Sequence, residues 1–340
     1  MGDNGERMQK RPDDNPVSFP EGYFFSYYWQ DVGGAAIDSP YWAERKAGMV
    51  AMRDAGATHA GVYIYHPSQM PGAVAKIAEL RAMGLNFMMD GSECFLARDF
   101  SGRADPSQTG PEWQDYLAQV ATLCDTFGLG ANDVAAWDIE WWNRTAAEKT
   151  NDWRARGKEL AAVVHANNPT PVILYGEQTQ HRLDNLLPGM HCWPGGTGDV
   201  PSPSIYLMDD MDAFDASIND GVSDWTGAVA VISFTYSDSI HGWMRLPDTT
   251  RSYTAGTKLR AAGFRGAWEY PGWSKAAFYG LPEGLFADYD EFVAYYKAQM
   301  KALIAGLAGI VLLEAKAEMT QKPDGKWRMS IDVQGFDTHG

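Results

Sequence analysis

Eight short apolar segments alternate with longer segments of helical pattern, and this alternation limits the fold more than any other feature of the chain. The strand-like segments are Tyr23–Trp29, His59–Tyr65, Leu85–Asp90, Val134–Glu140, Pro171–Gly176, Ser204–Met208, Ala228–Tyr236 and Phe264–Glu269. Parallel strands need long crossovers, usually helices, so such repeats favour a parallel sheet. Eight units over about 250 residues predict an α/β fold, a (β/α)8 TIM-type barrel, with a doubly wound open sheet as the alternative.

The intervening segments carry the start and stop signals of helices. The expected helices are Pro40–Ala55 with Ser39 as N-cap, Pro71–Met83, Pro111–Phe127, Thr145–Asn167, Met211–Asn219 and Ser252–Ala262. Proline is favoured in the first turn of a helix, where its missing N–H is not needed. Gly56, Gly84 and Gly263 each stand between a helix and the next strand, which is typical of a left-handed C-terminal cap.

The chain divides into three expected parts. A polar arm covers residues 1–18, a catalytic barrel covers residues 19–289, and a C-terminal extension covers residues 290–340. The extension is predicted to form a helix at Asp290–Leu307 and a β-hairpin at Ile310–Val333, whose turn signal is Asp324-Gly325. We expect it to pack on the barrel or on a neighbouring subunit, which makes the hairpin a candidate contact for a homo-oligomer.

Composition favours a folded, soluble protein with a neutral or weakly charged ligand. Of the 340 residues, 45% are hydrophobic, which is enough for a large core. A formal net charge of -16 repels nucleic acid and anionic membrane surfaces, so neither is an expected partner. No signal peptide or long apolar segment is visible, and the location stays open between the cytoplasm and a released or virion-associated protein. The spacing of Cys94, Cys124 and Cys192 does not predict a disulfide framework.

Two carboxylates, Asp138 and Glu140, stand two residues apart in the aromatic segment Ala136–Asn143. Residues i and i+2 of a strand share a face and lie about 6.6 Å apart along it. Like charge and surrounding Trp rings favour a raised pKa for the glutamate, which lets it protonate a leaving oxygen near neutral pH. The two residues are therefore a candidate catalytic pair. The alternative is that both carboxylates only meet water at a strand end.

Further candidates stand at the carboxyl ends of the other predicted strands, where the active site of such a barrel lies. The candidate substrate-binding residues are Tyr28, Trp29, Tyr65, Asp90, Tyr175, Glu177, Tyr206, Asp209, Tyr236, Trp268 and Glu269. Aromatic faces stack on sugar rings and carboxylates bind hydroxyl groups, so this set favours a poly- or oligosaccharide substrate. The alternative for any single ring is a place in the core. Because nucleotide, zinc-protease and serine-hydrolase motifs are absent from the sequence, we expect no cofactor and no metal.

Three segments resemble the hyaluronidase family. Trp137–Arg144 is similar to the Asp-x-Glu motif on that family's fourth strand, Pro203–Leu207 to its sixth-strand Pro-Ser-Ile-Tyr segment, and Gly263–Trp273 to its eighth-strand region. The similarity is confined to short segments of strands four to eight, and the family's cysteine framework is absent.

This resemblance implies roles for particular residues. Glu140 would be the general acid/base and Asp138 its partner. Tyr206 and Trp268 would line the subsite of the reacting sugar, and Tyr175 would match a tyrosine of the fifth strand.

The Asp-x-Glu spacing also resembles chitinase-type barrels. Asp133, Asp138 and Glu140 would match three of their four acidic positions, and Ala136 breaks the pattern. In both families the acetamido oxygen of the substrate is the nucleophile, so the protein supplies a single acid. Glu140 would protonate the glycosidic oxygen and later deprotonate water.

Three functions stay open. The leading hypothesis is a glycosidase that cleaves inside a polysaccharide, with Glu177, Asp209 or Glu269 as a second carboxylate if the substrate lacks an acetamido group. A lysozyme-like muramidase of bacterial or phage origin is the second reading, because such barrels also carry an Asp-x-Glu strand. A catalytically silent carbohydrate-binding barrel is the third, because a fold alone does not establish activity.

Overall fold

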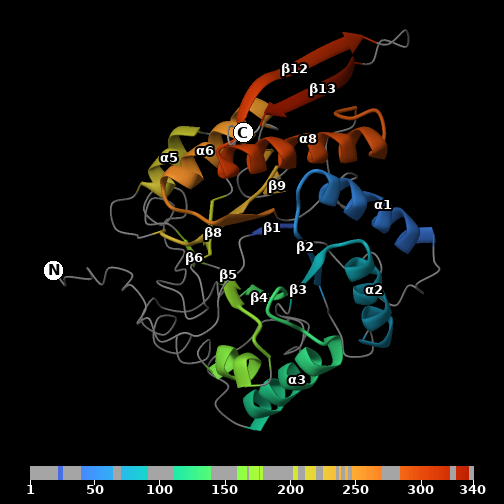
Figure 1. The fold of residues 1–340 in the computed structure, drawn as a ribbon, viewed down its shortest axis with the longest axis vertical. Helices are drawn as coiled ribbons and strands as arrows, with labels where there is room; N and C mark the ends of the chain where they lie inside the picture. Colours follow the sequence, from blue (N-terminus) through green and yellow to red (C-terminus); the bar gives the residue numbers. More distant parts are fainter. Residues whose placement is uncertain are drawn as a thin grey trace, which may run out of the picture.

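The structure, a computed structural model, is shown as a ribbon in Figure 1. It describes residues 22–25, 40–63, 70–90, 111–138, 159–166, 168–175, 177–178, 202–205, 211–219, 225–234, 237–238, 242–243, 247–269, 284–321 and 327–336. The predicted arm at residues 1–18 lies outside them.

A parallel sheet forms the centre of the molecule. Its strands are β1 (Gly22–Phe25), β2 (His59–Tyr63), β3 (Asn86–Asp90), β4 (Val134–Asp138), β5 (Val172–Tyr175), β6 (Glu177–Gln178), β7 (Pro203–Ser204), β8 (Val229–Ile232) and β11 (Gly266–Glu269). Their order is β5-β4-β3-β2-β1-β11-β8-β7-β6, and every pairing is parallel. Because a single residue separates β5 from β6, the two ends of this order belong to one strand, and the ring closes. The predicted (β/α)8 barrel is confirmed.

Each of the eight predicted strands overlaps an observed one. The agreement is closest for β3 and β5, which begin one residue later than predicted, and weakest for the sixth segment, where only Ser204 is shared with β7. The predicted carboxyl-terminal residues of six strands lie outside the described part of the chain, namely residues 26–29, 64–65, 139–140, 176, 206–208 and 235–236. The apolar runs therefore locate the barrel strands but not their ends.

The described helices lie around the strands (Figure 1). They are α1 (Pro40–Asp54), α2 (Met70–Ala82), α3 (Pro111–Phe127), α5 (Met211–Ile218), α6 (Thr249–Ala261) and α8 (Tyr289–Ala308), and residues 159–166 are also helical. The expected glycine caps are confirmed, with φ of 107° at Gly56, 83° at Gly84 and 93° at Gly263. Helix α6 begins three residues before the predicted Ser252, because Asp248 caps it by accepting a hydrogen bond from the Arg251 N–H at 2.8 Å.

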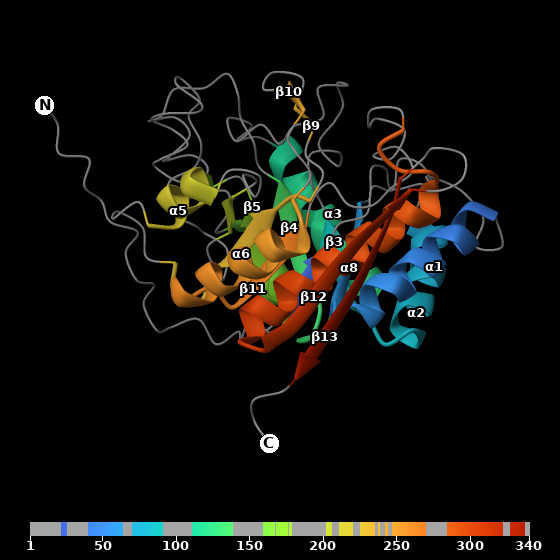
Figure 2. The same ribbon diagram turned by 90° about the horizontal axis from the view of Figure 1, so that it is seen from above.

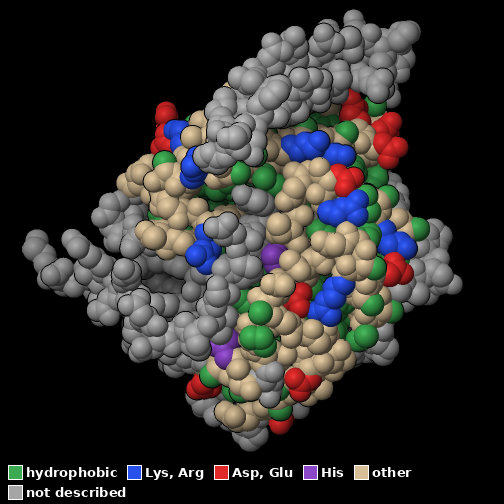
Figure 3. All heavy atoms as spheres, in the orientation of Figure 1, with side chains coloured by type: hydrophobic (Ala, Val, Ile, Leu, Met, Phe, Trp, Pro, Cys, Tyr) green, Lys and Arg blue, Asp and Glu red, His purple; other side chains and the backbone are tan. Residues whose placement is uncertain are grey.

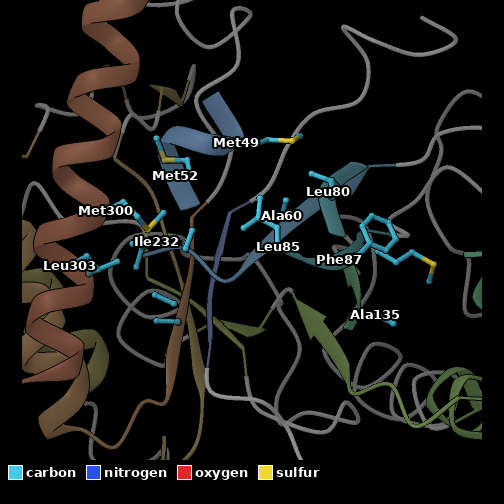
Figure 4. Close-up of a cluster of buried hydrophobic side chains, with 14 of the residues drawn as sticks. Met49, Met52, Ala60, Leu80, Leu85, Phe87, Ala135, Ile232, Met300 and Leu303 are labelled. Carbon is cyan, nitrogen blue, oxygen red and sulfur yellow. The ribbon is translucent and has the colours of Figure 1, made fainter. Parts of the chain in front are cut away.

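Alternation along the strands separates two groups of buried side chains. The inner group lines the barrel and consists of Met88, Val134, Ala136, Ile173, Val229, Val231 and Trp268. The outer group lies between strands and helices and includes the intervening residues Phe87, Ala135 and Ile232. Figure 4 shows these three with Met49 and Met52 of α1, Leu80 of α2, and Met300 and Leu303 of α8.

Helix α8 belongs to the helical layer of the barrel. It follows the last barrel strand, and its Phe292, Tyr296 and Leu303 are part of the outer core. The predicted boundary after residue 289 therefore precedes a helix that shares the core with the barrel. The remainder of the predicted extension is the hairpin.

The close contact between α6 and α8 is permitted by two facing glycines. A Cβ on Gly256 would lie 3.1 Å from the Gly306 Cα and would collide with the Leu303 carbonyl oxygen. The Ser252 hydroxyl of α6 also donates a buried hydrogen bond to the Gln299 side chain of α8. The two helices therefore pack backbone against backbone.

A two-stranded antiparallel hairpin, β12 (Val311–Gln321) and β13 (Trp327–Phe336), occupies the predicted segment and contacts α8 (Figures 1 and 2). Directly opposed residues share a face of the hairpin. Ala315/Val333, Ala317/Ile331 and Met319/Met329 are apolar pairs, whereas Glu314/Gln334, Lys316/Asp332 and Glu318/Ser330 are polar pairs. The role of the hairpin in oligomer formation stays a prediction.

The described outer surface carries charges of both signs side by side. In Figure 3, basic and acidic side chains are interspersed over the face that includes α1 and α2. Lys46 pairs with Glu79 at 2.8 Å and Arg53 with Asp54 at 2.7 Å. Such exposed pairs contribute little to stability. Among the described helices, none combines the length and apolarity needed to span a bilayer.

A buried histidine joins β2 to the turn before β4. His59 is 1% exposed, and its Nε2–H donates to the Asn132 carbonyl at 2.7 Å. Its Nδ1 therefore accepts from the Thr58 hydroxyl, also at 2.7 Å, which fits a neutral imidazole. Burial disfavours the charged ring and lowers the pKa of His59 to about 4.

We predict that Gly256→Ala destabilises the protein by at least about 2 kcal/mol, because α6 and α8 must separate to admit the methyl group. Gly130→Ala is the control, because the nearest atom to its added Cβ would be 3.8 Å away. Urea unfolding of both variants measures the difference. Equal stability of the two variants would contradict the glycine contact.

Stability should fall as the pH drops from about 6.5 to about 4. In this range the unfolded chain protonates His59 and the folded chain does not, so the folded state loses up to about 3 kcal/mol relative to the unfolded state. His59→Gln should reduce this dependence, because glutamine keeps an N–H donor and does not titrate. Urea unfolding at several pH values measures it, and identical slopes for the two proteins would show that His59 is not responsible.

Candidate active site

Three predicted site residues end adjacent barrel strands. Asp90, Asp138 and Tyr175 are the last residues of β3, β4 and β5. Asp138 and Tyr175 are register partners, whereas Asp90 pairs with Ala136 and so stands two residues further from the carboxyl edge than Asp138. The structure therefore brings these three predicted positions to one side of the barrel.

Strand alternation places the same three positions on the inner strand face. Met88, Ala136 and Ile173 belong to the core inside the barrel. Asp90, Asp138 and Tyr175 each follow one of these residues by two positions, and such residues share a face of a strand. Asp138 therefore occupies the carboxyl-terminal inner position of β4.

Trp268, predicted to line the sugar subsite, belongs to the interior of the barrel. It stands on β11, is 1% exposed, and packs in the inner core. Its register partner on β8 is Val231, another member of that core. Trp268 therefore fills the barrel, and its contact with a substrate stays a prediction.

Glu269 is the last residue of β11, as predicted, and its side chain is buried. It is 1% exposed and follows Trp268, so it stands on the outer strand face shared with Ala267. Its negative charge contributes, after burial, to raising the pKa of Tyr295 on α8. This position favours a structural carboxylate on the α8 side of the sheet, and contact of Glu269 with a substrate stays a prediction.

Asp133 stands immediately before β4, at the end of this strand opposite to Asp138. Its carboxylate accepts hydrogen bonds from the N–H groups of Phe87 and Gly130, both at 2.9 Å, and pairs with Arg81 at 2.7 Å. At strand rise it lies about 16 Å from Asp138 along the chain. Asp133 therefore has a structural role at the amino end of the barrel, and its match to an acidic position of chitinase-type barrels stays a prediction.

The other predicted site residues contribute little to the described geometry. Glu177 is the first residue of β6 and pairs with Pro203. Outside the described residues lie Tyr28, Trp29, Tyr65, Glu140, Tyr206, Asp209 and Tyr236. Among the residues that are described, no cluster of three His, Cys, Asp or Glu could hold a metal.

Sequence reasoning missed the functions of Arg81 and Tyr295. Arg81 donates to the Phe127 and Gly128 carbonyls as well as to Asp133. Tyr295 donates to backbone carbonyls of two distant segments. Helical periodicity could identify Tyr295 as buried, but no sequence signal names its acceptors.

Comparison with known proteins identifies barrels of the same fold. A GH18 chitinase from Cycas revoluta is similar with a TM-score of 0.54 and 9% identity, covering 82% of this chain and 99% of that chain. A family 5 xyloglucanase from Paenibacillus pabuli has a TM-score of 0.52 and 9% identity, over 84% and 98%. A GH5-4 broad-specificity endoglucanase from an uncultured bacterium has a TM-score of 0.51 and 11% identity, over 83% and 94%.

These similarities establish the fold. No protein-family model and no curated protein sequence matches the chain. The resemblance to hyaluronidases in particular is not confirmed, whereas a chitinase is among the similar structures. The chain therefore has the (β/α)8-barrel fold found in glycoside hydrolases.

We predict that Asp133→Asn destabilises the protein by about 2 to 3 kcal/mol. The amide would lose the ion pair with Arg81 and would place a second donor against a backbone N–H group. Asp54→Asn is the control, because the pair of Asp54 with Arg53 is exposed, so its loss should change stability little. Equal losses in chemical denaturation would overturn the anchoring role of Asp133.

Proposed function

We propose that this protein is a glycoside hydrolase that cleaves inside a polysaccharide, with Glu140 as general acid/base and Asp138 as its partner. The observation that carries the proposal is the position of Asp138, which ends β4 on the inner strand face at the carboxyl edge of the barrel. Active sites of such barrels lie at this edge. The fold shared with glycoside hydrolases supports the reaction class.

Sequence spacing extends this argument to Glu140. Val134 and Ala136 belong to the inner core, and Asp138 and Glu140 continue the same two-residue spacing. On such a strand the apolar residues fill the interior of the barrel, and the carboxylates at the carboxyl end would face the substrate. Tyr175, the register partner of Asp138, is the aromatic residue proposed to contact the sugar.

The proposed reaction uses one acid of the protein. Glu140 gives its proton to the glycosidic oxygen as the bond to the anomeric carbon breaks, and the acetamido oxygen of the substrate forms the new bond to that carbon. Asp138 orients the acetamido group and stabilises its positive charge. Glu140 then takes a proton from water, which attacks the same carbon and restores the acetamido group.

A substrate without an acetamido group requires a second carboxylate. Glu177, Asp209 and Glu269 are the proposed candidates, and burial on the outer strand face makes Glu269 the least favoured of them. A separation of about 5 to 5.5 Å between the two carboxyl groups would imply retention, and about 6.5 to 9.5 Å would imply inversion.

The charge of the chain narrows the substrate class. A formal net charge of -16 disfavours polyanionic polymers such as hyaluronan. Neutral N-acetylated polymers suit both the charge and the single-acid mechanism. We therefore propose chitin-like glycans as the first substrates to test, beside peptidoglycan as the substrate of the muramidase alternative.

Glu140→Gln should reduce the release of oligosaccharides by about 100-fold or more while oligosaccharide binding persists, because the amide cannot donate the proton. Asp138→Asn should also lower turnover. Glu79→Gln is the control, because Glu79 lies on an outer helix in an ion pair with Lys46. Reducing-end assays and mass spectrometry on neutral, N-acetylated and uronic-acid polymers, including peptidoglycan, measure the products.

Binding without release by the wild type would favour a silent carbohydrate-binding barrel, and equal release by Glu140→Gln would exclude Glu140 as the acid.

A further inference from the structure

A buried tyrosine of α8 reaches both ends of the segment that connects β8 to α6. Tyr295 is 4% exposed, and its hydroxyl lies 3.2 Å from the Phe234 carbonyl oxygen and 3.0 Å from the Pro247 carbonyl oxygen. The hydroxyl has one proton, which the two acceptors share. One side chain therefore holds together two backbone positions thirteen residues apart in the chain.

The connection begins at the carboxyl edge of the barrel. Phe234 follows the end of β8 by two residues, and Pro247 precedes Asp248, the N-cap of α6. Because the barrel strands are parallel, this edge is the one at which β4 ends with Asp138. Between the two anchored ends lies a short antiparallel pair, β9 (Ser237–Asp238) and β10 (Gly242–Trp243), shown in Figure 2.

The aromatic surroundings fix the ring of Tyr295. Its ring centroid lies 5.3 Å from that of Phe286 and 5.9 Å from that of Tyr296. Tyr296 in turn packs edge-on against Phe234, 5.6 Å away. The hydroxyl is therefore held in place by packing as well as by hydrogen bonds.

The electrostatic surroundings keep the hydroxyl protonated. Burial, followed by the nearby charges of Glu269 and Asp248, raises the pKa of Tyr295 well above its usual value. The group is thus a permanent donor to the two carbonyls.

We infer that Tyr295 is a positioning residue that fixes the β9–β10 pair beside the substrate path, so that this pair forms part of the substrate-binding wall. The inference rests on the proposed hydrolase function. Binding residues on connections that rigid elements hold in place lose less entropy when a ligand binds. Removal of the anchor should therefore weaken substrate binding more than it slows the chemical step.

Tyr295→Phe is the test, because it keeps the ring and removes only the hydroxyl. We expect KM for the responding polysaccharide to rise about five- to tenfold with kcat changed less than about twofold. Tyr253→Phe is the matched control, because its hydroxyl donates to the Ile310 carbonyl at 3.1 Å, at the far end of α8. The control should leave KM unchanged.

Hydrogen exchange supplies a readout that does not depend on activity. Amides of β9 and β10 should exchange faster in Tyr295→Phe than in the wild type, and at the wild-type rate in Tyr253→Phe. Unchanged exchange in Tyr295→Phe would overturn the anchor, and faster exchange with unchanged KM would overturn its role in substrate binding. Absence of turnover by the wild type on every polymer would count against the proposed hydrolase instead, while the exchange experiment would still decide the anchor.

Discussion

The alternation of side chains along closed parallel strands is the constraint on which the rest of this structure depends. Strands β3, β4, β5, β8 and β11 each place one residue in the interior of the barrel and the next in the layer beneath the helices. The same rule separates neighbours at the strand ends. Asp138 continues the inner series of β4, whereas Glu269 continues the outer series of β11 and is buried on the α8 side. Position at a strand end is therefore not enough to assign a carboxylate to a site.

The two ends of the barrel have different chemistry. At the amino end, His59 and Asp133 use their polar atoms to bind backbone groups of neighbouring segments, so they stabilise the fold. At the carboxyl end, Asp138 and Tyr175 terminate adjacent strands. Near this end, the hydroxyl of Tyr295 on the outer helix α8 donates hydrogen bonds to two backbone carbonyls. In this arrangement structural anchors lie away from the residues proposed to meet a substrate.

Much of the fold could be predicted because its signals are local. Apolar runs identify the strands, and Gly56, Gly84 and Gly263 identify the ends of helices. Contacts between distant segments could not be predicted in this way. The close approach of α6 and α8 through Gly256 and Gly306 has no local signal, so the sequence predicts the helix α8 but not its contact with α6. For the site, the sequence identifies which residues end β3, β4 and β5, whereas their relative levels follow from inter-strand register, which a single sequence does not contain.

Closure of the ring has a consequence for the order of folding. The first strand, β1, pairs with β2 on one side and with β11 on the other, and about 240 residues separate β1 from β11 in the chain. During synthesis β1 can find its first neighbour early but must wait for almost the whole barrel to be made before its other edge is covered. Such long-range pairings are slow, and open strand edges favour aggregation while they persist. The nascent chain is therefore most vulnerable just before β11 emerges.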